Sequence, residues 1–332
     1  MDGTLRLNLN ENPFNPIISF KEELINRLLK IDINRYPDQK YSRLRRALAK
    51  KLSLREENVI VGNGSDELIL YIFIAFMNAN LPIVIPYPTF TMYEKIASLL
   101  NLRIVKVPLI EESWDLPMED MEKALSEGAI LFLAYPNNPT GNLWNRDKIE
   151  KLAAKNRGIT VIDEAYYEFS GETMLNLIRK FDNVIILRTF SKAFGIAGAR
   201  VGYAISNESL ISRLEEVKLP FNLSAFSEEI ALFLLEKEEW VKSCVEQIIQ
   251  TREWFYNKLL NSSLLKVYPS RANFLLCKIL KSDLNIVELL EKKNIKIRKP
   301  DINGNYIRIS IGKREEVEGL WLSLKELQEK LT

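Results

Sequence analysis

Short runs of apolar, mostly β-branched residues alternate along the chain with longer segments in which apolar residues recur at helical spacing. Amphipathic segments such as Arg146–Lys155 and Glu208–Val217 predict helices. Alternation of strands and helices is typical of a mostly parallel sheet covered on both faces, so the pattern predicts an α/β fold. The predicted strands are Val59–Val61, Ile83–Ile85, Arg103–Val107, Ile130–Ala134, Thr160–Ile162, Val184–Leu187 and Val201–Ile205.

The pattern changes after the last of these strands and predicts a smaller α+β unit. The segment Leu5–Pro16 has no period long enough for an element of its own and predicts an arm that packs on the rest. We therefore expect a large domain over residues 35–236 and a small domain made of residues 1–34 and 237–332. The predicted elements of the small domain are a long helix from about Ser227 to Leu260, a strand in Ala272–Ile279, a helix near Asn285–Lys293, strands at Lys296–Arg298 and Tyr306–Ile311, and a last helix.

Composition narrows the class of protein. With 47% hydrophobic and 27% charged residues, the 332-residue chain resembles a soluble globular protein. The 46 basic and 44 acidic residues give a net charge of +2 without a dense basic run, which argues against nucleic-acid binding. The longest apolar stretch, Leu68–Met77, is shorter than the roughly 18 residues that span a bilayer. The first residues show no export signal, so we expect a cytoplasmic protein without a membrane partner.

The chain contains no histidine, which removes many catalytic chemistries. Ser-His-Asp and Cys-His hydrolases, histidine-ligated zinc enzymes and histidine general bases are all excluded. Two cysteines, Cys244 and Cys277, are too few for a four-cysteine zinc site, and we expect no metal. Proton transfer near neutral pH must use a perturbed lysine, a carboxylate, a tyrosine or a cofactor.

Polar clusters follow four of the predicted strands at their carboxyl ends. In open α/β sheets ligands bind beyond these ends, so we expect the four clusters to form one site. The clusters are Gly62–Glu67, Asn137–Gly141, Asp163–Tyr166 and Ser191–Phe194.

Each cluster has an ordinary structural explanation when it is taken alone. The turn Gly62–Glu67 opens an apolar helix, where Ser65 or Asp66 is a helix cap or part of an anion site. A carboxylate at position 163 is a helix cap or a buried charge that needs a positive partner. Lys192 is a solvated surface lysine, or a lysine whose buried stem lowers its pKa and makes it a nucleophile or base.

Taken together, the clusters supply the groups that bind pyridoxal phosphate (PLP). A lysine attaches the aldehyde covalently, and a carboxylate pairs with the ring nitrogen and keeps it protonated. A phenol and an amide, as in Tyr166 and Asn138, hydrogen-bond the ring oxygen. The glycine turn, Ser191 and Arg200 are suited to the phosphate.

The ordered set of motifs resembles the fold-type-I PLP-dependent aminotransferases of class II, and among them the histidinol-phosphate aminotransferases. The match runs in register from about residue 5 to residue 316, with Asn138, Asp163 and Lys192 separated by 25 and 29 residues. The motifs are Leu9-Asn10-Glu11-Asn12-Pro13, Arg35-Tyr36-Pro37, Gly62–Glu67, Pro88-Thr89-Phe90, Asn137–Gly141, Asp163–Tyr166, Thr189–Phe194 and Arg200–Tyr203.

The resemblance implies a role for each of these residues around the cofactor. Lys192 would hold PLP covalently and later move the proton between substrate and cofactor. Asp163 would pair with the ring nitrogen, Tyr166 and Asn138 with the ring hydroxyl, and Phe90 would stack on the ring face. Ser65, Asp66, Ser191 and Arg200 would surround the phosphate, and Tyr36 would reach the cofactor phosphate of a neighbouring subunit in a homodimer.

Substrate recognition is expected from the last predicted strand. Arg308 and Ser310 point the same way in Tyr306–Ile311, and by period alone this is a half-exposed strand with a solvated arginine. The resemblance implies that Arg308 grips the substrate α-carboxylate, a task that suits a guanidinium. Arg298 is the candidate for the substrate phosphate, and Asn10, Tyr36 and Asn138 for further substrate contacts.

The implied activity is an aminotransferase reaction of histidine biosynthesis, a PLP-dependent transamination between L-histidinol phosphate and 2-oxoglutarate. Three alternatives remain open at this point. They are an aromatic or broad-specificity aminotransferase, a threonine-phosphate decarboxylase, and a non-catalytic binding or regulatory protein with the same fold.

Overall fold

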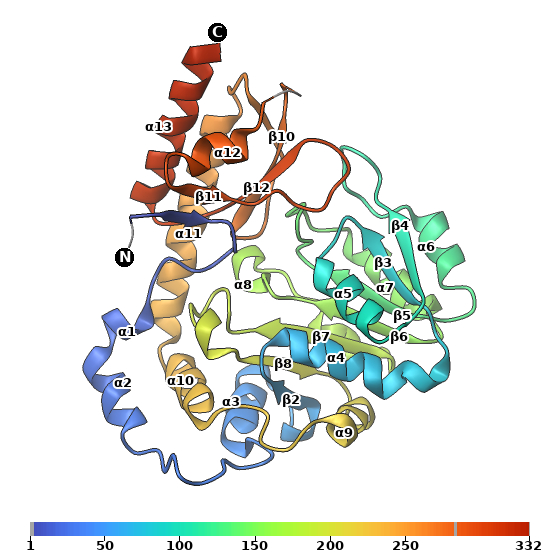
Figure 1. The fold of residues 1–332 in the computed structure, drawn as a ribbon. Helices are drawn as coiled ribbons and strands as arrows, with labels where there is room; N and C mark the ends of the chain where they lie inside the picture. Colours follow the sequence, from blue (N-terminus) through green and yellow to red (C-terminus); the bar gives the residue numbers. More distant parts are fainter. Residues whose placement is uncertain (1–2, 282–283, 332) are drawn as a thin grey trace.

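The computed structural model describes residues 3–281 and 284–331, and Figure 1 shows a large sheet flanked by helices beside a smaller unit that holds both chain ends. The large sheet has seven strands in the order β2-β8-β7-β6-β5-β3-β4. Their bounds are β2 (Val59–Gly62), β3 (Ile83–Tyr87), β4 (Ile104–Pro108), β5 (Ile130–Ala134), β6 (Ile159–Asp163), β7 (Val184–Thr189) and β8 (Gly202–Ile205). All seven predicted strands therefore exist, and the α/β fold class is confirmed.

Strand β8 is the exception to parallel pairing, because it runs antiparallel to both β2 and β7. Parallel neighbours need a crossover of a dozen or more residues, usually through a helix. Residues 190–201 instead join β7 to β8 by a loop that contains only the 3₁₀ turn η4 (Ala197–Ala199). This short connection returns the chain in the opposite direction and holds Lys192 at the end of the sheet.

The central strands are buried on both faces, which explains their nearly continuous apolar sequence. Within β5, Ile130 and Phe132 pack into one core and Leu131 and Leu133 into the other. One core is covered by α4 (Ser65–Phe76), α5 (Thr91–Leu99) and α9 (Glu208–Val217), the other by helices that include α3 (Ser42–Leu52), α6 (Met118–Ala124) and α7 (Arg146–Lys155). The remaining short elements near this sheet are η1 (Glu56–Asn58), η2 (Met77–Ala79), α8 (Tyr167–Ser170) and η3 (Leu175–Arg179).

The smaller unit is built around an antiparallel sheet in the order β12-β10-β9. The N-terminal arm joins this unit, because β1 pairs in parallel with β11. The arm thus holds a strand that the sequence did not predict, formed by pairing with a partner 290 residues away in register, Leu5 with Ile295. The bounds are β1 (Leu5–Leu7), β9 (Leu265–Val267), β10 (Phe274–Ile279), β11 (Ile295–Ile297), β12 (Tyr306–Ser310), α12 (Ile286–Glu291) and α13 (Arg314–Leu331).

The long helix expected from Ser227 to Leu260 is wrong as a single element. The chain forms α10 (Ala225–Glu236) and α11 (Glu238–Leu259), separated at Lys237, where φ is −100° and ψ is 38°. The Lys237 ammonium lies 4.9 Å from the ring centroid of Phe20, the residue before α2 (Lys21–Leu28). It also donates a hydrogen bond to Glu23, which lies within α2. These contacts stabilise the interruption between α10 and α11. The spacing of apolar residues along the chain does not reveal them, because α2, which follows α1 (Pro16–Ser19), is distant in sequence.

The division into residues 35–236 and the two flanking segments stays a prediction. Within the described residues we find no helix whose length and hydropathy would let it span a lipid bilayer.

Candidate active site

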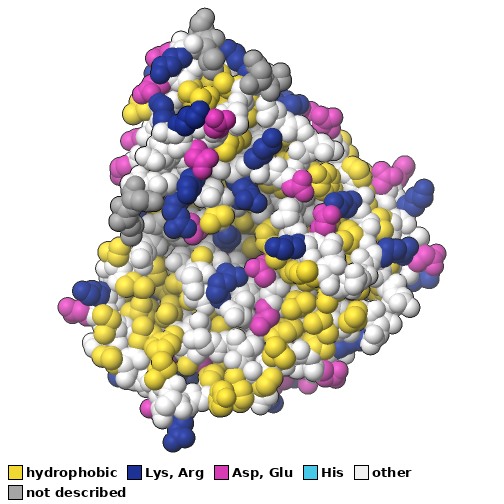
Figure 2. Space-filling view, in the orientation of Figure 1, with side chains coloured by type: hydrophobic (Ala, Val, Ile, Leu, Met, Phe, Trp, Pro, Cys, Tyr) yellow, Lys and Arg dark blue, Asp and Glu magenta, His cyan; other side chains and the backbone are white. Residues whose placement is uncertain are grey.

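A cavity of about 670 Å³ opens beyond the carboxyl ends of the central strands. Lys and Arg side chains gather near the middle of the face in Figure 2, between the upper and lower parts of the molecule. Every candidate residue from the sequence lines this cavity except Tyr36. The residues brought together are Asn10, Ser65, Asp66, Phe90, Asn138, Asp163, Tyr166, Ser191, Lys192, Arg200, Arg298 and Arg308.

Lys192 lies in the loop between β7 and β8 and reaches into the cavity. Its Nζ donates a hydrogen bond to the Leu9 carbonyl of the arm, at 3.0 Å. The side chain is open to the cavity but otherwise enclosed by protein. This burial, reinforced by the nearby Arg308 guanidinium, lowers the pKa of the Lys192 amine to about 8. At pH 7 about one amine in ten is then neutral, against fewer than about one in a thousand for an ordinary lysine.

Asp163 ends β6 as a buried carboxylate without a cationic partner. Its oxygens accept hydrogen bonds from the Tyr93 hydroxyl at 2.6 Å and the Ala165 amide at 3.1 Å. Among the described residues no lysine or arginine forms an ion pair with it. Burial raises the pKa of Asp163 to about 6, against the opposing hydrogen bonds of Tyr93 and Ala165. The carboxylate therefore suits a protonated nitrogen that would stand beside it.

The sequence did not single out Tyr93, the hydrogen-bond partner of Asp163. Tyr93 is fully buried in the first turn of α5, and burial raises the pKa of its phenol well above the ordinary value. It therefore remains a hydroxyl donor at neutral pH. The available signal was its position three residues after Phe90, because this spacing places both rings on one helix face, where they meet edge to face at 5.4 Å.

Arg308 and Asn138 meet at the side of the cavity that faces the smaller unit. Arg308 donates from Nη1 to the Asn138 side-chain oxygen at 2.7 Å and from Nη2 to the Asn8 carbonyl at 2.9 Å. Its Nε is buried with no hydrogen-bond partner, so the guanidinium keeps one N–H donor that the protein does not use. The alternation of polar and apolar residues alone predicted a solvated arginine at this position. That prediction is wrong, because the arm covers Arg308. Arg298 exchanges two backbone hydrogen bonds with Arg308 and so lies beside it.

The turn before α4 forms a cradle for an anion. Gly64 has φ of +79°, a conformation that favours glycine, and a Cβ there would also displace the Arg200 guanidinium, because it would lie 2.5 Å from Nη2. Arg200 bonds Asp66 at 3.1 Å and Ser191 at 3.3 Å. A helix N-terminus, an arginine and the hydroxyls of Ser65 and Ser191 together suit a phosphate.

Tyr36 lies outside the cavity of its own chain. Its ring is 81% exposed and stacks on Phe221 with 4.5 Å between centroids. The placement leaves this ring free to contact another molecule.

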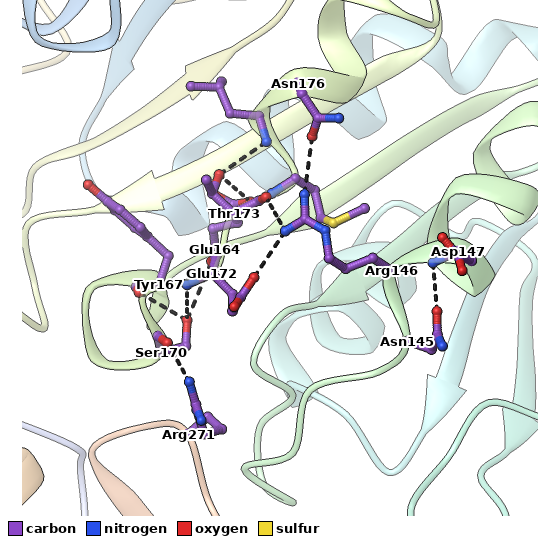
Figure 3. Close-up of polar contacts among 12 residues, drawn as sticks. Asn145, Arg146, Asp147, Glu164, Tyr167, Ser170, Glu172, Thr173, Asn176 and Arg271 are labelled. Atoms are coloured by element: carbon purple, nitrogen blue, oxygen red, sulfur yellow. Dashed lines mark hydrogen bonds and ion pairs between the residues drawn. The ribbon is translucent and has the colours of Figure 1, made fainter.

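A second feature that the sequence did not predict is a buried ion pair beneath the cavity. Arg188 on β7 donates to the Glu164 carboxylate from Nε at 3.0 Å and Nη2 at 2.8 Å, and both side chains are buried. Figure 3 shows Thr173 bonded to Glu164, and Arg146 holding the same loop through the Thr173 carbonyl. The pair joins the residue after Asp163 to the strand that leads to Lys192. An arginine inside the apolar run of β7 was the available signal.

Three comparisons place this geometry among known proteins. The family model described as aminotransferase class I and II matches residues 2–322. The chain is 38% identical to a histidinol-phosphate aminotransferase of Aquifex aeolicus, over 99% of this chain and 95% of that protein. It is equally identical to one of Pyrococcus furiosus, over 99% and 94%. A crystal structure of histidinol-phosphate aminotransferase from Sinorhizobium meliloti in complex with pyridoxal-5'-phosphate superposes with a TM-score of 0.90, at 26% identity, covering 99% of this chain and 92% of that one.

Proposed function

The chain belongs to the aminotransferase class I and II family, and on that premise we propose that it transfers the amino group between L-histidinol phosphate and 2-oxoglutarate. This is a PLP-dependent transamination of histidine biosynthesis. The observation that carries the proposal is one cavity that holds a lysine amine of lowered pKa together with a buried, unpaired carboxylate. The curated relatives at 38% identity support the choice of substrate.

The groups around the cavity fit PLP. Lys192 would hold it covalently, Asp163 would pair with the ring nitrogen, and the cradle at Ser65, Ser191 and Arg200 would take the phosphate. Phe90 would cover the ring face. When bound, PLP supplies a sink for the electron pair left as the substrate Cα–H bond breaks.

The protein's own residues would then position the substrate and move the proton. Lys192 Nζ would take the proton from the substrate Cα and pass it to the cofactor. In the second half of the reaction it would move a proton in the opposite direction. Arg308, with its unpartnered Nε, would bind the α-carboxylate of 2-oxoglutarate or glutamate. Arg298 would bind the phosphate of histidinol phosphate, because it stands beside Arg308 at the cavity wall. Asp163 would hold the ring nitrogen in its protonated form.

A homodimer is part of the proposal. The exposed ring of Tyr36 would complete the phosphate site of the neighbouring subunit, as the family resemblance implies. Other exposed apolar side chains lie on the same part of the chain, in and around α1 and α2 (Figure 2), and include Ile18, Leu29 and Ile33. Burying them against a second copy would be favourable.

We also propose a cytoplasmic location. The described cysteines, Cys244 and Cys277, are both free and buried, which suits a reducing compartment.

One assay series tests the proposed reaction. The purified enzyme with PLP should convert L-histidinol phosphate and 2-oxoglutarate to imidazole-acetol phosphate and L-glutamate. Lys192→Ala should lower kcat by at least about 10⁴-fold because the covalent amine and the base are both lost. Lys180→Ala, at a surface ion pair with Glu150, is the matched control and should keep full activity. Faster turnover of phenylalanine or tyrosine, or CO₂ release from threonine phosphate, would replace the proposal by the corresponding alternative. No turnover of any substrate would favour a non-catalytic protein.

A further inference from the structure

Asn10 joins the N-terminal arm to three other segments through all of its polar groups. Its backbone N–H donates to Ser310 Oγ at 2.8 Å, and its backbone carbonyl accepts from Asn273 Nδ2 at 3.0 Å. In the side chain, Oδ1 accepts from Ser310 Oγ at 2.8 Å and Nδ2 donates to the Tyr166 hydroxyl at 3.0 Å. Asn10 is 1% exposed, and each of its four polar atoms has a hydrogen-bond partner within the protein.

The partners of Asn10 determine which way its amide faces. Ser310 has a single hydroxyl proton, and the acceptor that the structure gives it is Asn10 Oδ1. If Oδ1 and Nδ2 of Asn10 exchanged places, the Ser310 hydroxyl proton would have no acceptor among the described residues. Nδ2 therefore faces Tyr166. The backbone supports the arrangement: φ is 54° at Asn10, a conformation that asparagine tolerates better than most residues.

The direction of this hydrogen bond constrains the Tyr166 proton. A phenol oxygen can accept hydrogen bonds but carries only one proton to donate. Because Asn10 Nδ2 donates to that oxygen, the Tyr166 proton must point elsewhere, and no described side chain or backbone group accepts it. The remaining direction is the cavity, which Tyr166 lines.

The charges around Tyr166 keep its phenol a neutral donor. Burial raises its pKa, opposed first by the Arg308 guanidinium on β12 and then by the Asn10 hydrogen bond. Asp163 on β6 and Asp66 on α4 raise it further, and the Lys192 ammonium lies 5.9 Å from the ring centroid. The Asn10 amide makes the phenol more acidic, and hence a stronger donor, without ionising it.

We propose that Asn10 is a positioning residue that fixes the Tyr166 hydroxyl as a hydrogen-bond donor to the ring oxygen of bound PLP. This inference rests on the proposed function, and it gives Asn10 a role other than the substrate contact expected from the sequence. It gives the N-terminal arm a part in setting the electronic state of the cofactor without touching it.

The test is a pH titration of the visible absorbance of the PLP-loaded protein. A donor to the ring oxygen stabilises its anionic form and lowers the pH at which the covalent link to lysine loses its proton. Tyr166→Phe should therefore raise the pH midpoint of the spectral change. Asn10→Gly, in which glycine tolerates the positive φ, should raise it in the same direction by about 0.3–1 pH unit.

The double variant distinguishes positioning from general loosening of the arm. In Tyr166→Phe the further change Asn10→Gly should leave the midpoint where it is, because the only hydroxyl it acts on is gone. The control is Asn12→Gly, which removes another amide of the arm, bonded to the Ala193 carbonyl, and should not shift the midpoint. Asn10→Ser serves as the second variant if Asn10→Gly does not fold.

Each outcome decides between the two proposals. An unchanged midpoint in the Asn10 variants, an equal shift in Asn12→Gly, or a shift that persists without the Tyr166 hydroxyl would overturn the positioning role. A wild-type protein that shows no visible band with saturating PLP would instead contradict the proposed function.

Discussion

At the scale of single residues, the cavity owes its chemistry to burial more than to residue type. Lys192 and Asp163 are ordinary side chains whose pKa values move toward neutrality, to about 8 and about 6, chiefly because protein surrounds them. The sequence could identify both, because each follows a strand end within a recognisable motif. It could not identify Tyr93 or the Glu164–Arg188 pair, because their roles depend on contacts between elements distant in sequence.

Glu168 is a buried carboxyl group that the proposed reaction does not use. Its Oε2 is buried without a hydrogen-bond partner, and burial raises its pKa to about 8. Between about pH 4.5 and pH 8 the folded protein holds this proton while the unfolded chain releases it, so stability falls as the pH rises through this window. Well above pH 8 both forms are ionised and the loss is complete.

Glu168→Gln removes this titration. Relative to the wild type, the free energy of unfolding of the variant should rise as the pH increases from 5 to 8, by on the order of 3 kcal/mol, and level off above that range. Urea unfolding at several pH values measures this. Glu172→Gln is the control, since it removes an exposed carboxylate paired with Arg146 and leaves Glu168 in place, and it should retain the pH dependence that Glu168 gives the wild type. A pH-independent difference for Glu168→Gln would show that its carboxyl group is ionised in the folded protein.

At the scale of elements, the sequence predicted the buried strands well and the arm poorly. A strand such as β5 fills two cores, so its apolar run identifies it without knowledge of its neighbours. Strand β1 exists only by pairing with β11, and its three residues carry no period of their own. The break between α10 and α11 at Lys237 has the same origin, since Phe20 and Glu23, at the start of the distant helix α2, fix it. Local pattern predicts local structure, and contacts across the chain supply the rest.

At the scale of the whole molecule, the arm connects the smaller unit to the cavity. Three successive residues of the arm, Asn8, Leu9 and Asn10, contact Arg308, Lys192 and Tyr166 in turn. One wall of the cavity is therefore formed by a segment that begins in the smaller unit.

The proposed dimer predicts that two defective subunits can restore one another. In a mixture of Lys192→Ala and Tyr36→Ala subunits, a hybrid dimer holds one site with both the intact lysine and the intact partner tyrosine. Random exchange of equal amounts makes about half of the dimers hybrids, so about a quarter of wild-type activity should appear above that of the separate variants. Activity equal to the mean of the two separate variants would place Tyr36 outside the partner's site.

The attachment of the cofactor to Lys192 is the central claim, and it can be read out directly. Borohydride reduction of the PLP-loaded protein, followed by peptide mass spectrometry, fixes the imine bond as a stable amine. We predict one phosphopyridoxyl group per chain, on the peptide that contains Lys192. A label on a different lysine, or no label at saturating PLP, would contradict the account.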